Sequence, residues 1–258
     1  LAERLRYEPG PNGARWLTAL VAPVRDQTGV IMAAVAIFRD VTEQRRAEFQ
    51  LRQLAAASLA INSATSTPER LRLITEHARA IVGAHQAVAS LTRGPDWSQA
   101  ITAVSLSDKY AAWRDYDAPT DGSGIYAEVC RTNRVFRLTQ AELERHPLWR
   151  GFGREAGRHP PLRGWLAVPL VGRDGRNLGL IQLSDKYEGD FTEQDEAVLV
   201  QLAQLAAVAL DNMALYEAEQ AARAEAEAAV RARDEYLSIA AHELKTPVTG
   251  LKGTVQLL

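Results

Sequence analysis

The chain has 258 residues, of which 47% are hydrophobic and 24% charged. This composition is typical of a folded protein, and the length suits one large domain or two small ones with connections. A net charge of -2 at pH 7 gives no electrostatic case for a nucleic acid or an anionic membrane surface as partner, so we expect neither.

The first 44 residues predict an antiparallel hairpin that leads directly into a helix. Two apolar runs, Trp16 to Val24 and Val30 to Phe38, flank the turn sequence RDQTG. Asp40 and Thr42 follow, and both side chains can accept NH bonds from the start of a helix. The hairpin and its DVTE sequence resemble the C-terminal end of a PAS domain. Residues 1–44 are therefore interpreted as a PAS remnant, too short to bind a ligand unaided.

Residues 45–67 predict a linker helix, and a mixed domain follows it. Helical composition from Glu43 to Asn62 ends at SATSTP, and a second helix is expected from Pro68 to Gly83. The remaining predicted elements are strands at 86–93 and 100–107, a helix at 125–133, a strand at 136–138, a loop at 146–163 and a strand pair within 164–185. Asp174-Gly175 supplies the turn of that last pair. Helices on an antiparallel sheet predict an α+β fold.

This central segment, residues 68–212, resembles a GAF domain. The resemblance rests on GWLAVPL, the Asp-Gly turn, LGLIQLSDKY and FTEQDEAVLVQLAQLAAVAL. It implies a six-stranded antiparallel sheet flanked by helices, with a ligand pocket on one face. GAF domains serve widely as sensor or dimerisation modules, so the resemblance implies a sensory role.

A long helix is predicted to begin after Thr192, where Asp195 three residues on forms an acidic variant of a capping box. Neither Gly nor Pro interrupts it before Pro247, where we expect a bend. Residues 213–235 are rich in Ala, Glu and Arg, too polar for a core helix, and are interpreted as a signalling helix that connects two domains.

The end of this helix carries the pattern of a coiled coil. Apolar residues recur every seven positions in two series offset by four: Val230, Leu237, Leu244, Leu251, Leu258, and Ala241, Val248, Val255. Such a pattern predicts a parallel homodimer that is joined along this seam. The seam weakens upstream of Val230, where Arg223 and Glu227 take its positions, and a shift in register or rotation there is expected to transmit signals.

His242 lies beside this seam and begins the sequence HELKTP. All six positions resemble the phosphorylation motif of a sensor histidine kinase, a two-component signalling protein. Residues 236–258 are therefore interpreted as the truncated start of the dimerisation and phosphotransfer domain. HELKT also shares two letters with the zinc-protease pattern HExxH, but position 246 is Thr, so that interpretation fails.

The resemblance implies a role for each residue of the motif. His242 would accept the phosphoryl group, Glu243 would act as general base, and Thr246 would position water for dephosphorylation. ATP would be bound by a separate domain that does not follow Leu258, so this segment alone is expected to be an inactive acceptor. The implied partner is the receiver domain of a response regulator. The alternative is a ligand-binding and dimerisation module with a non-kinase output.

Three sequence patterns bear on the ligand of the GAF domain. Lys186, Phe191, Asp195 and Glu196 resemble a motif of cyclic-nucleotide-binding GAF domains, although Asp185 replaces its Asn. An ion pair between Lys186 and Asp195 that joins the strand to the following helix would explain these residues without a bound nucleotide. The HPPLR sequence resembles haem-binding GAF domains, in which His159 would ligate iron.

Cys130 is the third candidate, as an attachment point for a bilin, but the adjacent His typical of such domains is missing and a small buried hydrophobe is the expected role. As the only cysteine it allows no intrachain disulfide, which favours a cytoplasmic location. No apolar run approaches the roughly 20 residues that span a bilayer, so no membrane contact is expected within this segment. Because the chain begins with Leu1 rather than Met, we expect a piece of a longer protein.

Overall fold

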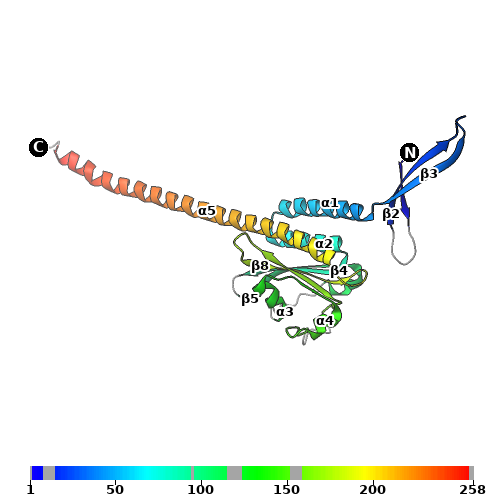
Figure 1. Cartoon of the computed structure of the whole chain (residues 1–258). Coiled ribbons are helices and arrows are strands. Elements are labelled where there is room, and N and C mark those ends of the chain that lie inside the picture. Colours follow the sequence, from blue (N-terminus) through cyan, green and yellow to red (C-terminus); the bar gives the residue numbers. More distant parts are fainter. Residues whose placement is uncertain (1, 8–14, 94–95, 115–123, 152–158, 256–258) are drawn as a thin grey trace. The chain divides into compact units, whose positions relative to one another are not determined.

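Figure 1 shows the fold as a computed structural model, which describes residues 2–7, 15–93, 96–114, 124–151 and 159–255. Side chains are described over residues 15–92, 102–114, 124–151 and 159–237. The chain divides into two compact units, Leu1–Ala207 and Val208–Leu258.

The first unit opens with an antiparallel three-stranded sheet in the order β1-β2-β3. Its strands are β1 (Ala2–Tyr7), β2 (Arg15–Arg25) and β3 (Ile31–Asp40). The predicted hairpin of β2 and β3 is confirmed, whereas β1 was not predicted. Every residue of β3 is exposed, including Met32 and Phe38. This small sheet therefore buries little apolar surface of its own.

The side chains of Asp40 and Thr42 hold the passage from β3 into helix α1 (Thr42–Ser63). The backbone NH of Thr42 donates to Oδ1 of Asp40 at 2.9 Å, as the sequence predicts. The Thr42 hydroxyl does not cap the helix, because it accepts the NH of Trp16 at 2.8 Å. Thr42 is the first helical residue, and its side chain ties the helix start to β2 instead.

Helix α2 (Thr67–Val82) packs beside α1 and is set by its end residues. Ser66 caps it, Pro68 lies in its first turn as predicted, and Gly83 ends it with a φ of 77°. Buried Arg70 donates from Nε to the carbonyl of Ile61 at 2.9 Å and from Nη2 to that of Ala64 at 2.7 Å. The guanidinium thus satisfies carbonyl groups at the C-terminal end of α1.

The central sheet is antiparallel throughout and has the strand order β5-β4-β8-β7-β6. Its strands are β4 (Ala84–Arg93), β5 (Asp96–Leu106), β6 (Phe136–Leu138), β7 (Trp165–Val171) and β8 (Asn177–Lys186). All five were predicted, and Asp174-Gly175 forms the expected turn. The resemblance implied six strands, whereas the described part of the chain contributes five to this sheet.

Helices cover both faces of the central sheet, with α2 on one side and α3 on the other (Figure 1). Helix α3 (Ile125–Thr132) was predicted, and Asn133 ends it in a left-handed conformation. Two helical segments were not predicted, namely the 3₁₀ helix η2 (Asp108–Trp113) and helix α4 (Gln140–Arg145). Thr139 and Glu142 form a complete capping box at α4, and their spacing of three residues could have predicted the start of this helix.

The α3 face of the sheet is filled by an apolar cluster around Trp165, whose side chain is completely buried. Its other buried members are Ile125, Val129, Cys130, Leu143, Ala167 and Leu180. The Trp165 Nε1 donates to Oε1 of Gln182 at 2.8 Å, so its one polar atom is satisfied. Cys130 is buried here, which confirms its predicted role as a small hydrophobe.

Helix α5 (Glu193–Val255) begins at the predicted capping box. The NH of Thr192 donates to Oδ2 of Asp195 at 2.7 Å, and the NH of Asp195 donates to the Thr192 hydroxyl at 3.3 Å. The helix continues past Pro247 to Val255. A proline removes one NH from the helical ladder, which need not end the helix.

By length and composition alone, α5 is apolar enough over Glu193–Leu237 to cross a membrane. An 18-residue window there has a mean hydropathy of 1.6, so the prediction that no apolar run approaches such a length was wrong. However, 44% of this window is buried, and Leu199 and Leu202 are core residues. Core helices of soluble proteins have the same character, so hydropathy does not assign α5 to a membrane.

Candidate functional site

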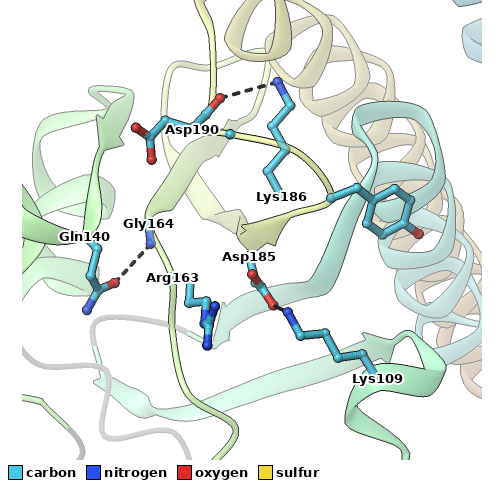
Figure 2. Close-up of a pocket in the computed structure, with 9 residues that line it drawn as sticks. Lys109, Gln140, Arg163, Gly164, Asp185, Lys186 and Asp190 are labelled. Atoms are coloured by element: carbon cyan, nitrogen blue, oxygen red, sulfur yellow. Dashed lines mark hydrogen bonds and ion pairs between the residues drawn. The ribbon is translucent and has the colours of Figure 1, made fainter. Parts of the chain in front are cut away.

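A pocket of about 520 Å³ opens at the end of β8 in the first unit (Figure 2). Its lining comes from five places in the sequence: η2, the start of α4, the segment before β7, the end of β8 and the loop into α5. The lining residues are Lys109, Gln140, Arg163, Gly164, Asp185, Lys186, Tyr187, Gly189 and Asp190. Charged groups of both signs thus surround one hollow.

Asp185 is the most buried charged residue of this lining, with 5% of its surface exposed. Its Oδ2 accepts hydrogen bonds from Nζ of Lys109 at 2.5 Å and from the hydroxyl of Tyr110 at 2.6 Å. Its backbone has a φ of 56°, a left-handed conformation that Asn and Asp tolerate better than most residues. The Asn of the related motif and the Asp found here suit this backbone equally.

Charge and burial set the protonation of this corner of the pocket. Burial raises the pKa of Asp185, but the hydrogen bonds from Lys109 and Tyr110 outweigh it, so that its pKa lies below the ordinary 3.8. Burial and the bond to Asp185 raise the pKa of Tyr110 to about 12. Asp185 is therefore a carboxylate at neutral pH, while Tyr110 stays protonated and donates to it.

His85 extends this network toward β5. Its Nδ1 lies 2.7 Å from the hydroxyl of Ser107, and its ring packs against Tyr187 with ring centroids 4.6 Å apart. Burial and the charge of Lys109 lower the pKa of His85 although Asp185 opposes them. The imidazole is therefore neutral at pH 7, so it adds no positive charge beside Lys109.

We predict that Asp185 makes stability depend on pH in the acid range. A carboxyl whose pKa is lower in the folded than in the unfolded chain stabilises the fold above its unfolded pKa, here about 3.8, and this stabilisation is lost as pH falls through the folded value. Asp185→Asn should therefore lower the free energy of unfolding at pH 7. The difference from the wild type should shrink below pH 3.8 in urea unfolding curves. A difference that stays constant from pH 7 to the acid limit would contradict this assignment.

The residues that resemble a cyclic-nucleotide motif have partners within the chain. Nζ of Lys186 pairs with Oδ2 of Asp195 at 2.5 Å, which confirms the predicted ion pair between strand and helix. Phe191 is buried, and Glu196 accepts from Nε of Arg137 at 2.8 Å. These contacts give the motif a structural role, because they join the end of β8 to the start of α5.

His159 does not line the pocket of Figure 2. Its Nδ1 lies 2.6 Å from the carbonyl oxygen of Pro160, and burial lowers its pKa although this carbonyl opposes the shift. A neutral imidazole is the form that ligates iron, so the residue suits the role chemically, whereas the charged lining of the described pocket does not suit haem. Haem ligation by His159 therefore stays a prediction from the sequence.

The predicted phosphoacceptor motif lies in the second unit, within α5. The backbones of His242, Glu243 and Thr246 are helical, and their side chains lie outside the described residues. The helix that was predicted for them is therefore present, while their roles remain predictions. Cys130, the other candidate, has a pKa raised to about 12 by burial, which argues against a reactive thiolate.

Sequence reasoning did not identify Lys109, Tyr110 or Arg163 as site residues. Lys109 and Asp185 are 76 positions apart, and they meet only because η2 follows β5 and β5 lies two strands from β8. The sequence did single out Asp185 and Lys186, because both belong to the segment that resembles the cyclic-nucleotide motif. The partners of Asp185 depend on strand order, which local patterns do not specify.

Residues 64–211, more than half of the chain, match the family model described as GAF domain. Among solved structures, the GAF domain of a phosphoenolpyruvate-protein phosphotransferase from Coxiella burnetii is 20% identical, with a TM-score of 0.52, and the match covers 66% of this chain and 96% of that one. The corresponding domain from Acinetobacter is 18% identical, with a TM-score of 0.50 and coverage of 64% and 93%.

An enzyme shares the fold as well. A free methionine-R-sulfoxide reductase from Neisseria meningitidis, solved in complex with its substrate, is 14% identical with a TM-score of 0.50. The match covers 64% of this chain and 90% of that chain. At such identities these structures establish the fold and carry no activity over to this chain.

Proposed function

This chain belongs to the GAF domain family, and from that premise we propose that it is the sensory and phosphoacceptor part of a two-component sensor histidine kinase. One observation carries the proposal. Helix α5 contains core residues of the GAF domain, such as Leu199 and Leu202, and also the six-residue sequence HELKTP that begins at His242. A single helix thus joins a sensory domain to a phosphoacceptor motif in sequence.

In the proposed reaction, a nitrogen of the neutral His242 imidazole attacks the γ-phosphorus of ATP. A nitrogen–phosphorus bond forms, the bond to the β-phosphate oxygen breaks, and ADP leaves. Glu243 takes the proton from the other ring nitrogen as positive charge develops on the ring. The phosphoryl group then passes from His242 to an Asp carboxylate of a receiver domain. Thr246 positions the water that later hydrolyses this aspartyl phosphate, so that inorganic phosphate leaves and the Asp carboxylate is restored.

Phosphorylation requires an ATP-binding domain. We propose that this domain acts on a homodimer that is joined through the heptad seam, and that the reaction takes place in the cytoplasm. The protein, mixed with a cognate ATP-binding domain and ATP labelled in its γ-phosphate, should become labelled. His242→Gln should abolish the labelling. His77→Gln, on α2, is the matched control and should be labelled like the wild type. Equal labelling of the wild type and His242→Gln would refute the proposal.

Signals are proposed to pass along α5 as a rotation or register shift where the seam is weak. Arg223 and Glu227 take seam positions there, both are exposed, and they pair at 2.9 Å. One residue inserted after Arg223 turns the following helix by about 100° and should change the labelling rate at least tenfold in either direction. Seven inserted residues nearly restore the phase and should leave the rate close to that of the wild type.

If the single and the seven-residue insertions have equal effects on the labelling rate, the proposed transmission through helix phase is wrong. His242 is unchanged in both variants. The comparison therefore tests how the signal passes along α5 separately from the ability of His242 to accept the phosphoryl group.

A second candidate is a GAF ligand-binding and dimerisation module whose output is not phosphotransfer. The pocket beside Asp185 favours it, because the pocket is complete without the HELKTP sequence. Unlabelled wild-type protein in the assay above, with ligand binding retained, would favour this module over the kinase. Haem is a ligand of that kind, and a Soret band in the reconstituted protein that His159→Ala removes would establish it.

A further inference from the structure

Two charged side chains and one carboxylate oxygen of the pocket lining take no part in the ion pairs that build it. Lys109 is held by Asp185, and Lys186 is held by Asp195. The groups that remain are the guanidinium of Arg163, the second carboxylate oxygen of Asp185 and the carboxylate of Asp190, and all three residues line the pocket. Pockets that recognise small polar ligands commonly contain a few such convergent groups.

Arg163 supplies the positive group. It is exposed, it lies in the segment that leads into β7, and within the described part of the chain it forms no ion pair. Burial raises the pKa of Tyr110, and the positive charge of Arg163 opposes this rise. The guanidinium is therefore close enough to influence Tyr110, which donates a hydrogen bond to Asp185. A guanidinium presents a planar fork of donors that fits a carboxylate.

Asp185 and Asp190 supply the negative groups. Both hydrogen bonds to the Asp185 carboxylate end on Oδ2, and Oδ1 accepts none from the residues that the structure describes. Asp190 is exposed, and its backbone carbonyl rather than its carboxylate accepts from Lys186 (Figure 2). An oxygen of a largely buried carboxylate gains from a charged donor, because hydrogen bonds between charged groups are the strong ones.

We propose that this pocket binds a free α-amino acid, with the ligand carboxylate on Arg163, its ammonium group on Oδ1 of Asp185, and Asp190 as a second carboxylate of the lining that attracts the ammonium group. The opposite charges of the lining match a zwitterion, whereas a simple anion would meet two carboxylates and a simple amine would meet Arg163. A volume of about 520 Å³ admits an amino acid with its side chain.

This inference goes beyond phosphotransfer by His242 and does not depend on it. The test uses the whole chain and the twenty common amino acids, each added singly, with binding followed by calorimetry and by the shift in unfolding temperature. At least one amino acid should bind. Its analogues that lack either the amino or the carboxyl group should bind at least tenfold more weakly, as expected for the loss of one charged hydrogen-bonded contact.

Variants then locate the site. Arg163→Gln and Asp190→Asn should each weaken binding about tenfold or more, and both residues are exposed, so the fold should tolerate them. Arg134→Gln is the matched control, since Arg134 is exposed and outside the pocket, and it should bind like the wild type. Absence of binding by all twenty amino acids would overturn the proposal. Binding that Arg163→Gln and Asp190→Asn leave unchanged would overturn it too.

Discussion

Replacing Glu243 with Gln should slow phosphorylation of His242 by about a hundredfold or more while leaving His242 itself in place. A positioned general base contributes about 10²- to 10⁴-fold to a proton-transfer step. Gln keeps the size and can still form hydrogen bonds, but it cannot take the proton that leaves the imidazole ring. The measurement is the initial rate of label incorporation with a fixed amount of the ATP-binding domain.

Glu235→Gln is the matched control for this prediction. Glu235 is an exposed residue of the same helix that lies two turns before His242, and it has no role in the proposed reaction. Its rate should equal that of the wild type. If Glu243→Gln and Glu235→Gln were labelled at the same rate, the general-base role of Glu243 would be wrong, even with His242 as acceptor.

Trp165→Ala should lower the free energy of unfolding by about 3–5 kcal/mol, the usual cost of truncating a large buried aromatic side chain. Trp165 is completely buried, and its ring contacts those of Tyr126 and Phe136 at centroid distances of 5.5 Å and 6.2 Å. The loss leaves a cavity and removes the donor to Gln182. Urea unfolding followed by circular dichroism measures the change.

Tyr236→Ala provides the comparison for Trp165. Tyr236 is 72% exposed on α5, so truncating it should change the free energy of unfolding by no more than about 0.5 kcal/mol. Equal losses in the two variants would show that the cluster under α3 is not a core of the GAF domain.

The parts of the fold that the sequence predicted correctly are those set by neighbouring residues. Thr192 and Asp195 cap α5 because they are three residues apart, and Asp174-Gly175 closes a hairpin because Gly175 accepts a φ of 79°. Alternating and continuous apolar runs identified the strands of the central sheet. The GAF resemblance then fixed the class of fold.

The parts that were missed depend on residues far apart in the chain or on competition between partners. Thr42 was expected to cap α1, but the NH of Trp16, which is 26 positions away, takes its hydroxyl. The pocket forms only when η2 brings Lys109 to Asp185. No local pattern specifies such pairings, because strand order decides them.

Phosphorylation of His242 can be tested by locating the label in the protein and by determining the chemical stability of its bond. After labelling with the ATP-binding domain, the protein should be digested and the labelled peptide identified by mass spectrometry. We expect a single labelled peptide that contains His242, with a phosphoryl bond that is stable in alkali and lost in acid, as for a phosphohistidine. A label that survives acid, or one that lies on a peptide without His242, would contradict it.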